Sequence, residues 1–271
     1  MKDIQYVILK KEYFGDFISR LSRLKKLAAP VGKGYDNYSF EPVTSSDKVA
    51  LHYKPTILPP KKYFLPRQET VIEYSLNKDL RAEAVVQYER MVLFGVHTCD
   101  LAGIQCLNMV FSQRPKDYNY LIRKNKIDII GLECNEYCDE YASCNLVNAS
   151  MPSGGYDLFF TDMGDYFVIH INTQVGDEIL DATKFVEPAA KSHLRELVRL
   201  REKKRDIFRN ELDIEARNIP ALFDRLFESN VWKDLGERCL ACGNCTNVCP
   251  TCYCFDIVDD VNLELRGGRR Y

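Results

Sequence analysis

The feature that most constrains the fold of this 271-residue chain is a dense run of cysteines near its C-terminal end. The stretch CLACGNCTNVCPTCYCF (residues 239–255) holds six of the eleven cysteines. Cys239, Cys242, Cys245 and Cys249 follow the spacing C-x2-C-x2-C-x3-C, and a proline comes directly after. Thiolates are soft, anionic ligands, so we expect this segment to fold around a metal group.

The spacing is typical of bacterial ferredoxins, in which the first three cysteines bind one [4Fe–4S] cluster and the fourth binds a neighbouring cluster. The small residues Ala241, Gly243 and Asn244 let the backbone approach such a cluster. Structural zinc also takes four cysteines, but its sites more often show two C-x2-C pairs far apart. Iron–sulfur is therefore the favoured interpretation. A two-cluster domain needs further ligands, and no cysteine follows Cys254.

Cys252 and Cys254 extend the run and leave three interpretations open. They can be cluster ligands, redox thiols or small buried residues. Because free cysteine commonly packs as a small hydrophobic residue, we expect the last of these.

The overall composition is that of an ordinary globular protein, with 46% hydrophobic and 28% charged residues. A formal net charge of -2 argues against a general nucleic-acid binder. The sequence contains neither a signal-peptide pattern nor an apolar run of about 18 residues, so we expect no membrane span. An odd number of cysteines with metal-type spacing is unlike a secreted disulfide framework. We therefore expect a cytoplasmic protein.

Ahead of the cysteine run, the pattern alternates between strands and helices. Residues 90–96 and 126–134 are apolar enough for buried strands, and the first is followed by an apolar helix over residues 101–111. We also expect helices at residues 14–26 and 189–208. Further along, residues 166–173 form another strand, and residues 54–66 hold four prolines, cannot be helical and form an extended arm pinned by Tyr63 and Phe64.

The predicted fold class is thus an α/β N-terminal domain followed by an incomplete α+β domain like the bacterial dicluster ferredoxins. We place the boundary near residue 225, where the composition shifts toward the cysteine-rich segment. The domains would span residues 1–225 and 226–271.

A second group of cysteines lies in the first domain. Cys99 follows one predicted strand and Cys134 ends another, while Cys138 and Cys144 lie on the loop after Cys134. If the two strands are parallel neighbours, both thiols reach the carboxyl edge of the sheet, where ligands gather in open α/β folds. The four thiolates could bind one additional [4Fe–4S] cluster. The alternative is that these cysteines are buried or have no functional role.

Two neighbouring residues are less informative. His97 can bind a metal or donate a hydrogen bond to a cysteine sulfur, but a structural histidine in a turn is the more common case. We expect Cys106, inside the apolar helix, to be part of the core. The chain lacks the dinucleotide fingerprint, the P-loop, the zinc-protease motif and the nucleophile elbow.

The stretch RCLACGNCTNVCPTCYCFDIVDD resembles a family of iron–sulfur subunits that occur in anaerobic sulfite reductases and, as the beta subunit, in cytoplasmic sulfhydrogenases. The segments KPTILPPKKYFLP, GVHTCDLAGIQCLNMVF and GLECNEYC are similar to that family as well. The resemblance implies partners: a subunit that binds FAD and NAD(P), and a catalytic subunit with siroheme or a nickel–iron centre.

Two departures from the family pattern stand out. The family's central segment usually closes with C-x-C, whereas here Cys144 is followed by Asn145 and Leu146. Cys138 is the candidate for the vacant ligand position. The family also continues past RGGRRY into a second ferredoxin-type run, so we expect the missing ligands to belong to a further C-terminal part.

Two functions follow from these observations. The first is an electron-transfer subunit of a cytoplasmic multi-subunit oxidoreductase, which would itself carry out no bond-making chemistry. Its cofactors would be two ferredoxin-type [4Fe–4S] clusters in the complete protein and one further candidate cluster in the N-terminal domain. The second is a non-redox interaction scaffold in which iron–sulfur clusters or zinc stabilise the fold.

Overall fold

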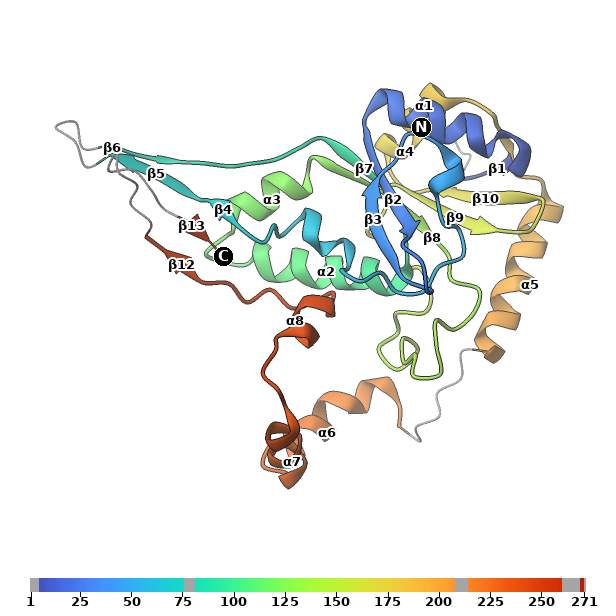
Figure 1. Ribbon diagram of the computed structural model, residues 1–271. Coiled ribbons are helices and arrows are strands. Elements are labelled where there is room, and N and C mark those ends of the chain that lie inside the picture. Colours follow the sequence, from blue (N-terminus) through green and yellow to red (C-terminus); the bar gives the residue numbers. More distant parts are fainter. Residues whose placement is uncertain (1–4, 76–80, 208–213, 260–268, 271) are drawn as a thin grey trace.

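The computed structural model describes residues 5–75, 81–207, 214–259 and 269–270, and its centre is an eight-stranded mixed sheet (Figure 1). In spatial order, its strands are β11 (Val186–Pro188), β1 (Tyr6–Lys10), β10 (Tyr166–Ile171), β9 (Leu158–Asp162), β8 (Ile127–Leu132), β7 (Met91–Val96), β2 (Lys26–Gly32) and β3 (Tyr38–Pro42).

The centre of the sheet is parallel. Strand β7 pairs in parallel with β8 and with β2, and β8 pairs in parallel with β9, while the outer pairs are antiparallel. All six residues of β7 are buried, as expected for a strand covered on both faces. The predicted strands at residues 90–96 and 126–134 are thus confirmed, and they are parallel neighbours.

Helices cover both faces of the sheet. On one face, α1 (Phe14–Leu24) and α4 (Gln174–Thr183) pack on residues such as Phe94. On the other, α2 (Thr98–Ser112) and α3 (Tyr118–Lys124) pack on residues such as Leu93. The alternation of Leu93 and Phe94 follows from the two-residue period of a strand.

The long charged helix α5 (Lys191–Ile207) lies beside β10 and confirms the helix expected near residues 189–208. It buries Leu197 against Ile8 and Val168, while most of its surface stays polar. Short 3-10 turns occur at η1 (Lys11–Tyr13) and η2 (Ser46–Lys48).

The position of Cys106 differs from the expectation. Helix α2 turns Leu101, Ile104 and Leu107 toward the sheet, and all three are buried. Cys106 comes two residues after Ile104, which is about 200° around a helix of 3.6 residues per turn. Its side chain is exposed, so the prediction that it belongs to the core was wrong.

The proline-rich arm is anchored as predicted. Phe64 is fully buried, and the Tyr63 hydroxyl donates a hydrogen bond of 3.0 Å to the Phe40 carbonyl. The arm also contains a 3-10 turn, η3 (Pro60–Tyr63), although we expected no helix there. Proline is tolerated at the first position of a helical turn because its missing N–H would have no partner.

Beyond the arm, the chain forms small sheets away from the main one. Strands β5 (Ile72–Ser75) and β6 (Arg81–Ala84) make a projecting hairpin. Strands β12 (Ile257–Val258), β13 (Arg269–Arg270) and β4 (Glu69–Thr70) form a three-stranded sheet that joins the segment after the arm to the segment after the cysteine run.

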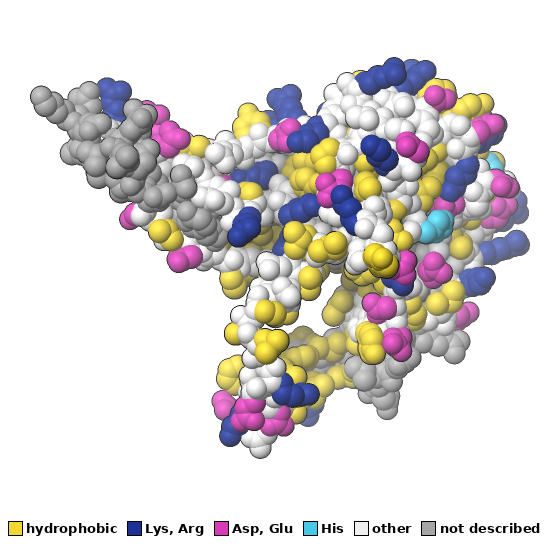
Figure 2. All heavy atoms as spheres, viewed as in Figure 1, with side chains coloured by type: hydrophobic (Ala, Val, Ile, Leu, Met, Phe, Trp, Pro, Cys, Tyr) yellow, Lys and Arg dark blue, Asp and Glu magenta, His cyan; other side chains and the backbone are white. Residues whose placement is uncertain are grey.

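The cysteine-rich segment follows three short helices, η4 (Ala216–Asn218), α6 (Ile219–Arg225) and α7 (Asn230–Arg238), and itself contains α8 (Asn244–Val248). Helices α6 and α7 stand off from the sheet, and hydrophobic side chains are visible around the hollow beside them (Figure 2). The chain then returns, and α8 lies next to α2. Within the described ranges, no helix is long and apolar enough to cross a membrane.

Candidate metal centres

The first candidate centre lies at the carboxyl edge of the parallel strands. Cys99 is in the first turn of α2, directly after β7, and Cys134 is the second residue after β8. Since β7 and β8 are parallel neighbours, both chains leave the sheet at the same edge. The positional argument from the sequence is therefore confirmed for these two residues.

All four cysteines of the predicted set line one cavity. Its volume is about 260 Å³, and its wall contains Cys99, Cys134, Cys138 and Cys144. The last two lie on the loop after β8, which folds back through local turns; for example, the Ala149 N–H donates to the Cys144 carbonyl at 2.8 Å. The structure thus brings together residues that are up to 45 positions apart in the sequence.

The surroundings of the four thiols favour their neutral forms in the absence of a metal. Burial raises the pKa of Cys99, and the charges of Cys134, Cys138 and Cys144 raise it further. Burial likewise raises the pKa of Cys134 to about 12 and that of Cys138 to about 11. Such mutual repulsion among thiolates disappears when cationic iron occupies the space between them.

Positive potential reaches the same cavity from two elements. The Thr98 N–H, at the start of α2, hydrogen-bonds to the Cys134 sulfur and lowers its pKa. The N-terminus of a 15-residue helix also carries partial positive charge, which stabilises an anionic group. From α5, the charge of Lys204 lowers the pKa of both Cys134 and Cys144.

Helix α5 is held at this edge by a buried ion pair. Arg201 donates to Glu133 at 2.9 and 3.1 Å, and the Lys204 ammonium lies 3.4 Å from the same carboxylate. Burial alone would raise the pKa of Glu133, but hydrogen bonds and charge from Arg201, aided by Lys204, lower it. The sequence analysis missed this group, because Arg201 and Lys204 are two of many charges on a polar helix.

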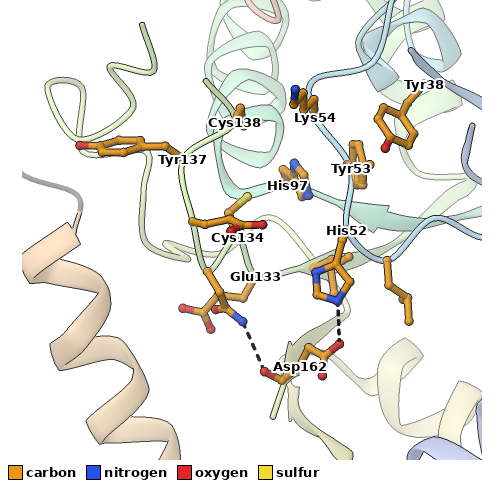
Figure 3. Close-up of a pocket in the computed structure, with 14 residues that line it drawn as sticks. Tyr38, His52, Tyr53, Lys54, His97, Glu133, Cys134, Tyr137, Cys138 and Asp162 are labelled. Atoms are coloured by element: carbon orange, nitrogen blue, oxygen red, sulfur yellow. Dashed lines mark hydrogen bonds and ion pairs between the residues drawn. The ribbon is translucent and has the colours of Figure 1, made fainter. Parts of the chain in front are cut away.

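A second cavity shares a wall with the first. It has a volume of about 380 Å³, and Figure 3 shows residues that line it. Cys134 and Cys138 border both cavities. His97 lines it and stacks on Tyr53 with 3.8 Å between ring centroids. Burial lowers the pKa of His97 to about 3, so it is a neutral, packed histidine. Tyr53 was also missed, since nothing in its local sequence marks it.

The cavity fits a cluster better than a single ion. Among the residues that the structure describes, no group of three or more histidine, cysteine or acidic side chains is close enough to hold one metal ion. A cubane cluster places four irons between its ligands, so its thiolates stand farther apart than those of one zinc ion. Four cysteines around one partly buried cavity suit such a group. Their role as ligands remains a prediction.

The ferredoxin-type run forms the second candidate centre. Cys239 follows α7, Cys242 lies in the loop, Cys245 is in α8 and Cys249 follows α8. Ala241 and Gly243 have φ values of 50° and 72°, which fold the loop tightly. The first three thiols are exposed and the fourth is partly buried. Binding of clusters by this run also remains a prediction.

The last two cysteines differ from each other. Cys254 is exposed, so the expectation of a buried residue was wrong for it. Cys252 is partly buried and hydrogen-bonds to Cys249. Burial alone would raise the pKa of Cys249, but hydrogen bonds from Thr251 and Cys252 lower it to about 7.

Two comparisons with known proteins bear on the family of this chain. A family model described as a 4Fe-4S dicluster domain matches residues 238–271. Sulfhydrogenase 2 subunit beta of Pyrococcus furiosus is 33% identical over 257 residues, which cover 94% of this chain and 75% of that protein. The similarity therefore extends over the α/β part as well as the cysteine run.

Proposed function

The chain belongs to the iron–sulfur subunit family that includes the sulfhydrogenase beta subunit, and from this premise we propose that it is an electron-transfer subunit of a multi-subunit oxidoreductase. It would relay electrons between a subunit that binds FAD and NAD(P) and a catalytic subunit. The name of the relative favours a hydrogenase as that catalytic subunit, of the nickel–iron type that the family resemblance implies, with a siroheme sulfite reductase as the alternative.

The observation that carries the proposal is the convergence of Cys99, Cys134, Cys138 and Cys144 on one cavity, in a chain that also has a dicluster domain. We assign one [4Fe–4S] cluster to these four residues. In the complete protein, two more would belong to the ferredoxin-type domain, with Cys239, Cys242 and Cys245 on one cluster and Cys249 on the other; each cubane needs four ligands, so further ligands must complete both. When bound, such clusters take up and release single electrons.

The remaining features fit a relay rather than a catalyst. All eleven cysteines are free thiols, which suits a reducing cytoplasm. Glu133, which directly precedes Cys134, is engaged in a structural ion pair with Arg201. We retain the division near residue 225 as a proposal, with the α/β part before it and the ferredoxin-type part after it.

The test is to isolate the native complex under anaerobic conditions and add NAD(P)H. Bleaching of iron–sulfur absorption in this subunit, lost when the flavin subunit is removed and restored by dithionite, supports the relay. A chain that co-purifies with partners but holds only zinc, or iron that never changes its redox state, would instead be a metal-stabilised scaffold.

A further inference from the structure

Gly103 lies in close contact with the ferredoxin-type run. A Cβ atom placed on this glycine would lie 2.7 Å from the Pro250 Cβ, closer than real side chains approach, and 3.1 Å from the Pro250 carbonyl oxygen, which is a tight contact. A glycine inside a helix is destabilising relative to alanine. At this position the absence of a side chain has a clear structural use, because it lets Pro250 lie on the backbone of α2.

The contact joins the two candidate centres through one helix. Cys99 precedes Gly103 by four residues, which is about 6 Å of helix rise. On the other side, Pro250 directly follows Cys249. One turn of α2 therefore separates a ligand candidate of the N-terminal centre from the segment that carries the fourth cysteine of the run.

Two further contacts hold the run on the same surface. The Lys61 ammonium donates to the Thr246 carbonyl at 2.8 Å and to the Cys252 carbonyl at 2.9 Å. At the far end of α2, the rings of Phe111 and Tyr253 meet edge to face, 5.5 Å apart. The run is thus held by the arm at Thr246 and Cys252 and by α2 at Pro250 and Tyr253, and Figure 1 shows α8 next to that helix.

We propose that Gly103 is a positioning residue for electron transfer: it seats the ferredoxin-type run on α2, so that electrons pass directly between the N-terminal centre and the centre that Cys249 ligates. This inference rests on the proposed function. One electron leaves the reduced cluster of one centre and enters the oxidised cluster of the other. No bond is made or broken, and no proton needs to move.

The test compares Gly103→Val with Cys106→Val in the anaerobically purified native complex. Both changes put valine on α2, but the Cys106 side chain is exposed, whereas a side chain at position 103 would meet Pro250. After full reduction with dithionite, paramagnetic clusters that lie close together split each other's EPR signals. We expect the signal of the N-terminal cluster to be split in the wild type and in Cys106→Val, and to lose this splitting in Gly103→Val, with iron content unchanged; coupling within the ferredoxin-type domain should persist in all three.

A second variant reaches the same contact from the other side. Pro250→Gly removes the ring that rests on Gly103 without adding volume, and we expect it to weaken the splitting too. If Gly103→Val loses iron or fails to fold, the EPR splitting measured in Pro250→Gly becomes the deciding result. The inference is overturned if the splitting survives in Pro250→Gly, or if the fully reduced wild type shows none. Absence of iron–sulfur signals from the wild type would instead overturn the proposed function.

Discussion

Arg201 of α5 lies against Glu133, directly after β8, and donates hydrogen bonds of 2.9 and 3.1 Å to its carboxylate. The Glu133 side chain is fully buried, and the nearly buried Lys204 approaches the same carboxylate. Because Glu133 directly precedes Cys134, this ion pair sets where the chain leaves the sheet toward the cysteine cavity. It links a helix far along the sequence to the first candidate centre.

The first prediction concerns this pair. Glu133→Gln keeps the shape of the side chain but leaves Arg201 and Lys204 without their buried counter-charge. Removal of one partner from a buried ion pair destabilises a protein by roughly 3–5 kcal/mol. We expect a loss of that size in the free energy of unfolding, measured by urea titration under anaerobic conditions.

The control is Glu187→Gln, which removes the same charge from an exposed pair with Lys10. Pairs of that kind contribute about 1 kcal/mol or less. Equal losses from the two variants would show that the Glu133 pair does not hold α5 at the edge of the sheet.

The second prediction concerns the arm. Lys61→Met removes the two hydrogen bonds to the Thr246 and Cys252 carbonyls. We expect faster proteolytic cleavage within residues 239–255, because the run would be held less firmly on α2. Limited proteolysis with mass spectrometry of the fragments measures this.

Lys62→Met is the matched control, since Lys62 donates to the Phe40 carbonyl in the α/β part instead. If both variants were cleaved as slowly as the wild type, the Lys61 contacts would have no part in holding the run.

The sequence predicted the central features of the first centre because they depend on local patterns. The apolar runs that became β7 and β8 place Cys99 and Cys134 at one edge whenever the strands pair in parallel, and they do. The burial of Glu133 could not be foreseen, since its partner Arg201 is 68 residues away. Arg201 lies on a highly charged helix whose sequence predicts a solvent-exposed surface. Cys106 was misplaced because an apolar helix does not show which way each residue faces.

The contact of the run with α2 was equally hidden. Nothing in the local sequence distinguishes Gly103 from other helix residues. Its proposed positioning role follows only from the close approach of Pro250, which is distant in sequence. Pairing between β4 and β13 also joins distant segments by backbone hydrogen bonds, which leave no side-chain signature.

The third prediction tests the N-terminal centre. Cys134→Ser should lower the iron content by about one cluster, because oxygen is a harder and poorer ligand for iron–sulfur than thiolate. The ferredoxin-type signals should remain. Cys106→Ser is the control, as its exposed side chain lies outside the cavity, and it should leave the iron content unchanged. An unchanged iron content in Cys134→Ser would mean that these four cysteines bind no cluster.

The central claim is that this chain binds iron–sulfur clusters that carry electrons. Its most direct test is the analysis of iron, zinc and acid-labile sulfide in the anaerobically purified protein, followed by reduction with dithionite and reoxidation. We predict a brown protein with iron and sulfide in near-equal amounts, whose colour bleaches and returns. Zinc in place of iron, with no sulfide and no reversible bleaching, would contradict the claim.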